Sequence, residues 1–111
     1  MTENQQIAAT ILNQLGGQRR LIAMTSAKDF VAIDKGVQFA IGKNSKGINK
    51  VRIVLNAADT YDVEFGFARM NWTTCEHTWA VKDETKGAYA EMLMDLFESA
   101  TGLYLTFGTR H

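Results

Sequence analysis

The sequence predicts an α+β domain spanning residues 1–111, in which an antiparallel sheet of about five or six strands carries two helices on one face. Two observations support this class. Residues 51–69 alternate between apolar and polar side chains, which is typical of a half-buried hairpin. Residues 3–15 and 89–100 instead carry apolar side chains at helical spacing, so an N-terminal and a C-terminal helix are expected.

The first helix has clear start and stop signals. Thr2 and Gln5 fit a capping box, in which each side chain bonds to the backbone N–H of the other residue. Apolar residues then follow along one helical face: Ile7, Ala8, Ile11, Leu12 and Leu15. Gly16-Gly17 ends the stripe, because glycine adopts the left-handed conformation common after a helix. We expect this helix from about Glu3 to Leu15.

Three segments follow before the chain's central hairpin. Residues 20–25 form a short apolar run that is consistent with a strand. Residues 30–33 and 37–41 predict a hairpin, because Asp34-Lys35-Gly36 between them has turn chemistry. Residues 42–49 are polar, basic and glycine-bearing, which favours an exposed, mobile loop.

The central hairpin is the strongest strand signal in the chain. Its apolar residues fall on one face: Val51, Ile53, Leu55, Tyr61, Val63, Phe65 and Phe67. Asn56 and Asp59 flank the turn, where short side chains bond to nearby backbone groups. A further strand is expected over residues 77–82, with Trp79 and Val81 as candidate core residues.

The last helix has the best periodic match in the chain. Its apolar stripe contains Tyr89, Met92, Leu93, Leu96, Phe97 and Ala100. Gly102 is its stop signal. Glu91, Asp95 and Glu98 are expected on the opposite, solvent-facing side. The segment from Leu103 to Phe107 is apolar enough to pack on the sheet as a short edge strand.

Composition narrows the class of protein. The chain is 46% hydrophobic and 22% charged, values of a globular protein rather than a disordered one. One cysteine cannot form an intrachain disulfide, which favours a reducing compartment. The sequence shows neither an apolar run of membrane-spanning length nor a signal-peptide pattern. We therefore expect a cytoplasmic protein that does not contact a membrane.

Candidate chemistry is sparse. Cys75 and His77 would supply two metal ligands, whereas a structural zinc site needs four. As a catalytic pair they would need a third, orienting group. The alternative is an ordinary loop cysteine beside a solvated histidine. We expect no catalytic residue, no metal and no cofactor, and hence a protein that is not an enzyme.

Charge raises a nucleic-acid hypothesis. The formal net charge is zero, but residues 1–55 hold eight basic against three acidic residues (+5) and residues 56–111 hold four against nine (−5). The candidate phosphate-binding residues are Arg19, Arg20, Lys43, Lys46, Lys50 and Arg52. Against this, the neutral total and the assignment of Phe39, Phe65 and Phe67 to the core favour a solubilising lysine loop at residues 43–52.

A protein-contact surface is the other hypothesis. Trp72 lies in a polar segment, where an exposed indole often anchors a partner protein. Burial at the sheet edge is the alternative. With the acidic side of the last helix, the candidate contact residues are Trp72, Glu91, Met94, Asp95 and Glu98. An exposed edge strand or the C-terminal tail could also pair two chains as a homo-oligomer.

Three segments also carry a family resemblance: TILNQLGGQRRLIAMTSAKDF (10–30), GINKVRIVLNAADTYDVEFGFAR (47–69) and GAYAEMLMDLFESATGLYL (87–105). Together they resemble a family of small uncharacterised proteins of tailed bacteriophages, prophages and related mobile elements. Residues 70–79 fall outside the resemblance. It implies the cytoplasm of an infected or lysogenic bacterium. It also implies a non-enzymatic accessory protein that binds a host or phage protein, for instance to inhibit a bacterial defence system. The family supplies no catalytic or binding residue to carry over.

Overall fold

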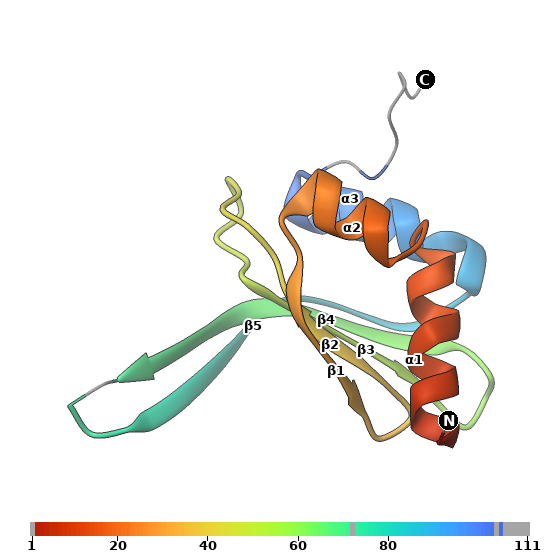
Figure 1. Ribbon diagram of the computed structural model, residues 1–111, viewed down its shortest axis with the longest axis horizontal. Coiled ribbons are helices and arrows are strands. Elements are labelled where there is room, and N and C mark those ends of the chain that lie inside the picture. The colour runs from red at the N-terminus through yellow and green to blue at the C-terminus, as the bar shows by residue number, and fades with distance from the viewer. Residues whose placement is uncertain (1, 72, 104, 106–111) are drawn as a thin grey trace.

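Five β-strands and three α-helices make up the part of the chain that the computed structural model describes, residues 2–71, 73–103 and 105 (Figure 1). In chain order the elements are α1 (Glu3–Gln14), α2 (Gln18–Thr25), β1 (Lys28–Ile33), β2 (Gly36–Ala40), β3 (Lys50–Leu55), β4 (Tyr61–Asn71), β5 (Glu76–Ala88), a 3-10 turn (Ala90–Met92) and α3 (Leu93–Thr101). The predicted α+β class with an antiparallel sheet is confirmed.

The sheet is a meander in which each strand pairs antiparallel with the next, in the order β1-β2-β3-β4-β5. Because side chains alternate across a strand, the sheet has two different faces. One face is buried under the helices, as Figure 1 shows, and carries Val37, Phe39, Val51, Ile53, Val63 and Phe65. The other, which we call the open face, carries a cross-strand row of polar residues: Gln38, Arg52, Glu64 and Glu84.

The core lies between the buried face and the helices. From α1 it takes Ile11, which is fully buried, and from α3 it takes Leu93 and Phe97. The Phe97 ring stacks 6.4 Å from the ring of Phe39 and meets the ring of Phe65 edge-on at 6.2 Å, centroid to centroid. This aromatic cluster joins α3 to β2 and β4.

The N-terminus of α1 is tied to the β1–β2 turn. The predicted capping box of Thr2 and Gln5 is present. Lys35 in the turn donates its backbone N–H to Asn4 Oδ1 and pairs through Nζ with Glu3 Oε1 at 2.7 Å. The hydrogen bond from Lys35 lowers the pKa of the Glu3 carboxyl, and the same bond raises the pKa of Lys35. Both groups are solvent-exposed, so the pair contributes little to stability.

The strand expected over residues 20–25 is wrong, because α2 occupies that segment. Leu21 and Thr25, one helical turn apart, are buried, and the Thr25 hydroxyl donates to the Leu21 carbonyl at 2.6 Å. Ile22 between them is 47% exposed. The apolar run therefore buries one helical face, and the sheet has five strands in the described residues rather than six.

The C-terminal part differs from expectation in two ways. β5 continues to Ala88, so residues 83–88 form strand instead of the approach to the last helix. The α-helix itself starts only at Leu93, and Tyr89, expected in its apolar stripe, is 59% exposed. Leu103 and Leu105 are not in a strand, and the rest of the predicted edge strand lies outside the described residues.

A hairpin arm projects from the sheet. β3 pairs with β4 only as far as Gly66, whereas β4 and β5 stay paired from Phe67 opposite Ala80 to Asn71 opposite Glu76. Residues 67–71 and 76–80 are therefore paired with each other but not with the rest of the sheet, and Figure 1 shows them extending away from the body. We call this segment the arm. None of the helices in the described part of the chain combines the length and the apolar character needed to cross a membrane.

Candidate functional site

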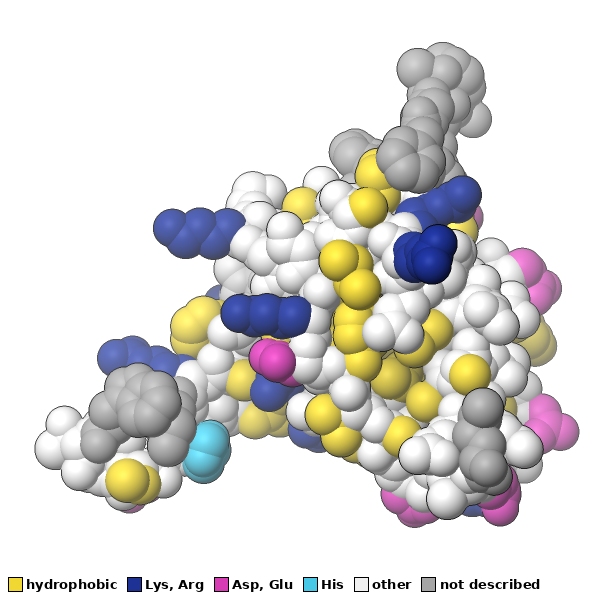
Figure 2. Space-filling view, viewed as in Figure 1, with side chains coloured by type: hydrophobic (Ala, Val, Ile, Leu, Met, Phe, Trp, Pro, Cys, Tyr) yellow, Lys and Arg dark blue, Asp and Glu magenta, His cyan; other side chains and the backbone are white. Residues whose placement is uncertain are grey.

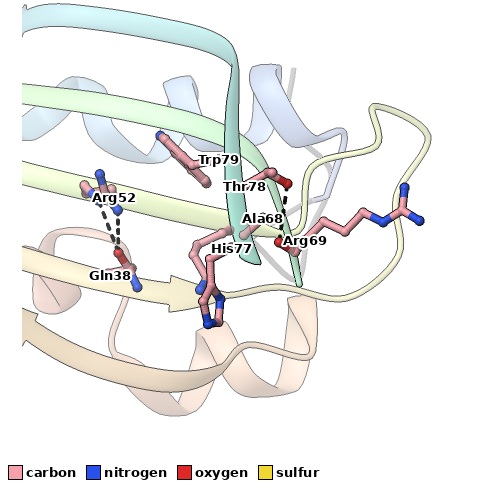
Figure 3. A pocket seen from close by; sticks show the side chains of 8 residues that line it. Gln38, Arg52, Ala68, Arg69, His77, Thr78 and Trp79 are labelled. Atoms are coloured by element: carbon pink, nitrogen blue, oxygen red, sulfur yellow. Dashed lines mark hydrogen bonds between the residues drawn. The ribbon is translucent and has the colours of Figure 1, made fainter. Parts of the chain in front are cut away.

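A pocket of about 310 Å³ lies on the open face where the arm leaves the sheet (Figure 3). We call it the arm pocket. Strands β2, β3, β4 and β5 all contribute to its lining, which consists of Gln38, Lys50, Arg52, Ala68, Arg69, His77, Thr78 and Trp79. Its volume is at the lower end of the range of small-ligand sites, roughly 300–1,000 Å³. It has room for one small group rather than for an extended ligand.

Trp79 forms the aromatic wall of the arm pocket. It is half-buried and pairs across the strands with Ala68. Its six-membered ring crosses the backbone of Gly66, where a Cβ atom would lie 2.8 Å from Cη2 of the indole. The ring thereby reaches from β5 across β4 to Arg52 on β3, whose guanidinium carbon is 5.1 Å from the ring centroid. This is a cation–π contact.

Arg52 is held in place by its neighbours along the open face. Its Nε and Nη2 donate to Gln38 Oε1 at 3.2 and 2.9 Å, and Nη1 lies 3.8 Å from Glu64 Oε1. These partners lie directly across the strands in register with Arg52. Since the Gln38 oxygen is taken by Arg52, its amide nitrogen is the remaining polar group of that side chain, and it is a donor.

Two further cations and a histidine of the arm pocket are not engaged. Lys50, Arg69 and His77 make no side-chain hydrogen bond or ion pair with any residue that the structure describes. The lining contains no Asp or Glu. Figure 2 shows Lys and Arg side chains around the base of the arm, whereas most Asp and Glu side chains on that view lie at the other end of the molecule. The pocket is therefore locally basic although the chain is neutral overall.

Asn49 connects the arm to the preceding loop. Its Nδ2 donates to the Ala68 carbonyl at 2.8 Å, and its Oδ1 accepts from the Ala68 N–H at 2.7 Å. The side chain thus imitates one more residue of strand pairing at the position just before β3 begins. Asn44 closes the loop itself, because its amide group bonds to Gly42, Lys46 and Ile48. The loop expected to be simply exposed and mobile is held by two asparagines.

Asn49→Ala is therefore expected to loosen the arm. The backbone N–H of Ala68 would lose its acceptor, and the carbonyl would lose its donor. Hydrogen exchange should show faster exchange at Ala68 and the arm residues beyond it, with the N–H groups of β2 unchanged. Asn56→Ala, which breaks a similar asparagine network in the β3–β4 turn, is the matched control. Equal exchange of the arm in wild type and Asn49→Ala would contradict the positioning role of Asn49.

A second pocket of about 270 Å³ lies beside the base of the arm. Loop residues 41–49 and Phe67 line it. Phe67, expected in the core, is 40% exposed, whereas Phe39 and Phe65 are buried as predicted. The reason is that Phe67 lies beyond the last residue of β4 that pairs with β3.

The predicted phosphate-binding residues are divided between sites. Lys50 and Arg52 belong to β3 rather than to a loop, and both line the arm pocket. Lys43 lines the second pocket. Lys46 lies in the loop and lines a smaller cavity together with Lys82 of β5. Arg19 and Arg20 are on α2 and do not line the arm pocket.

The predicted protein-contact residues do not form one exposed surface. Glu91 and Asp95 are exposed, and Met94 is half-buried against the core. Glu98, expected to face solvent, is 7% exposed, because its Oε2 accepts the Leu105 N–H at 2.7 Å where the chain folds back. The expected exposure of Glu98 to solvent is therefore wrong. Trp72 lies outside the described residues.

Cys75 and His77 do not act as a pair in the structure. Cys75 is exposed in the β4–β5 turn with a positive φ of 59°, and His77 lies in β5 at the arm pocket. Among the described residues, no three His, Cys, Asp or Glu side chains are grouped as metal ligands.

Sequence reasoning missed Arg69, His77 and Trp79 as members of a basic site. Trp79 and Val81 were predicted as core, but Trp79 is half-buried on the open face and Val81 is 43% exposed. Comparison of the chain with protein-family models, with curated proteins and with solved structures found no match. The resemblance to bacteriophage proteins therefore stays a prediction.

Proposed function

We propose that this protein is a non-enzymatic nucleic-acid-binding module whose ligand lies on the open face of the sheet at the arm pocket. The observation that carries the proposal is the arm pocket, where the unengaged cation Lys50 and the guanidinium of Arg52 line the same site as the half-buried indole of Trp79, while the unengaged Arg69 side chain extends outward from its edge (Figure 3). Basic side chains bind phosphate and aromatic rings pack on bases, and this combination is typical of proteins that bind nucleic acid.

The geometry supports this function better than the protein-contact hypothesis. Lys50, Arg52 and Arg69 come from two adjacent strands and all line one pocket that has no acidic lining residue, although the Arg69 side chain extends outward (Figure 3). Of the candidate protein-contact residues, in contrast, Glu98 is buried and Met94 is half-buried. A neutral total charge is compatible with binding because the basic side chains are concentrated locally.

The family resemblance suggests a setting for this activity. In a cell that carries a bacteriophage or prophage, a small accessory protein can act by occupying a nucleic acid or by blocking a host complex bound to it. The binding of a host or phage protein is still a prediction, with Glu91 and Asp95 as its exposed candidates.

Fluorescence anisotropy with a labelled oligonucleotide tests the proposal. Wild-type protein should bind with an affinity that falls as salt rises, because phosphate contacts release counterions. In Lys50→Glu/Arg69→Glu, binding should weaken, and the slope of log K against log salt should become shallower by about 2, roughly one per lost contact. Neither the half-buried Lys50 nor the exposed Arg69 has a side-chain partner among the residues that the structure describes, so the thermal midpoint should change little.

Lys86→Glu is the matched control, since Lys86 is an exposed lysine of β5 outside the arm pocket. It changes the net charge in the same direction and should leave the salt slope as in wild type. The proposal fails if wild-type protein shows no salt-dependent binding. It also fails if the double variant binds no more weakly than Lys86→Glu.

A further inference from the structure

We infer that the ligand of the arm pocket is single-stranded, and that one unpaired base enters the pocket and packs against Trp79. This inference rests on the proposed function and adds the class of nucleic acid. A phosphate backbone alone would need only exposed cations. The arm pocket in addition has an aromatic wall, set back within a concave site of about 310 Å³.

The aromatic wall is fixed before any ligand binds. The indole of Trp79 rests across Gly66, and the Arg52 guanidinium lies over its ring. Arg52 in turn is bonded twice to Gln38 and paired with Glu64. Because these groups lie on four adjacent strands, the ring position is set by the sheet. A preorganised ring loses less conformational entropy when a base packs on it.

The polar groups around the wall suit what flanks an unpaired base. Lys50, Arg69 and the Gln38 amide nitrogen are all hydrogen-bond donors. Phosphate oxygens and base carbonyls are hydrogen-bond acceptors. These donors can therefore bind the phosphates on either side of the base and the carbonyl groups on the edge of the base. In a duplex the ring faces of the bases are covered by their stacked neighbours. The ring of Trp79, inside a concave pocket, can therefore contact a base face only in an unpaired strand.

Three labelled probes with matched numbers of phosphates test the inference by anisotropy: oligo(dT), an oligomer of abasic sites of the same length, and a duplex of half that length. Wild-type protein should bind oligo(dT) more tightly than the abasic oligomer and the duplex. Trp79→Ala should weaken binding of oligo(dT) by about 5- to 150-fold, the usual range for loss of base stacking. It should leave binding of the other two probes nearly unchanged. Trp79→Phe, which keeps an aromatic ring, should retain most of the preference.

A second measurement does not depend on the folding of Trp79→Ala. The chain has two tryptophans, so Trp72→Phe leaves Trp79 as the only indole. Its fluorescence should be quenched on titration with oligo(dT) and not with the abasic oligomer. Equal binding of all three probes, or quenching by the abasic oligomer alone, would overturn the inference while leaving the proposed function standing. If no probe binds in a salt-dependent manner, the proposed function itself fails.

Discussion

Phe97→Ala is expected to lower the free energy of unfolding by about 3–5 kcal/mol, the usual cost of removing a buried phenylalanine ring. Phe97 is 1% exposed, and its ring lies against both Phe39 and Phe65. Truncation would leave a cavity between α3 and the sheet that backbone atoms on both sides cannot fill. Because small domains have only about 5–15 kcal/mol of stability in total, the variant should be close to its folding limit.

Urea denaturation followed by circular dichroism measures this difference. Met92→Ala is the control, since Met92 is 39% exposed in the 3-10 turn just before α3 and should cost within about 0.5 kcal/mol, as most surface substitutions do. Similar unfolding midpoints for the two variants would mean that α3 is not packed on the aromatic cluster as described.

The central hairpin could be predicted because every local signal agrees with its tertiary position. Every second residue of the two strands between 51 and 65 is apolar. Each of these apolar side chains is buried except that of Leu55, which is half-buried. Asn56 closes the turn as expected, with Oδ1 accepting from the N–H groups of Ala58 and Thr60 at 2.9 and 3.2 Å. The prediction is confirmed here because this alternating pattern can bury its apolar side chains together only if the segment is a strand.

Two elements could not be predicted because their local patterns are ambiguous. The apolar run in residues 20–25 is too short for periodicity to distinguish a strand from a helix. Burial of Leu21 and Thr25 against the rest of the fold decides for the helix. β5 is an edge strand that is exposed over most of its length, so it carries no alternation that a sequence could show. Its extent is set by pairing with β4, which is a long-range interaction.

The arm pocket depends on pairing between strands more than on composition. Lys50 and Arg52 were evident as basic residues, but the sequence does not show that they lie on the open face next to the arm. Trp79 joins them because the β4–β5 register shifts between Phe65 and Gly66. A bulge at this position changes the face to which the following side chains point. The alternation of residues within one strand does not predict such a shift.

Gly66→Ala is expected both to destabilise the fold and to displace the Trp79 ring that forms one wall of the arm pocket. In an ordinary strand this change would stabilise by roughly 0.5–1 kcal/mol, because alanine loses less backbone entropy than glycine. At Gly66 the new Cβ would collide with the Ala80 carbonyl oxygen and lie 2.8 Å from Cη2 of Trp79. We therefore expect a cost of about 1–3 kcal/mol, as for other overpacked sites, measured as a lower unfolding midpoint.

The same substitution should displace the indole, and this effect can be separated from the collision with backbone by a double-mutant cycle with Trp79→Ala. If the ring rests on Gly66, the stability cost of Gly66→Ala should shrink when Trp79 is already alanine, while the part due to the Ala80 carbonyl persists. Oligo(dT) affinity should follow the same cycle, since Gly66→Ala should add little once the indole is gone. Costs that are simply additive would show that Gly66 does not position Trp79, and that the glycine serves only the pairing of β4 with β5.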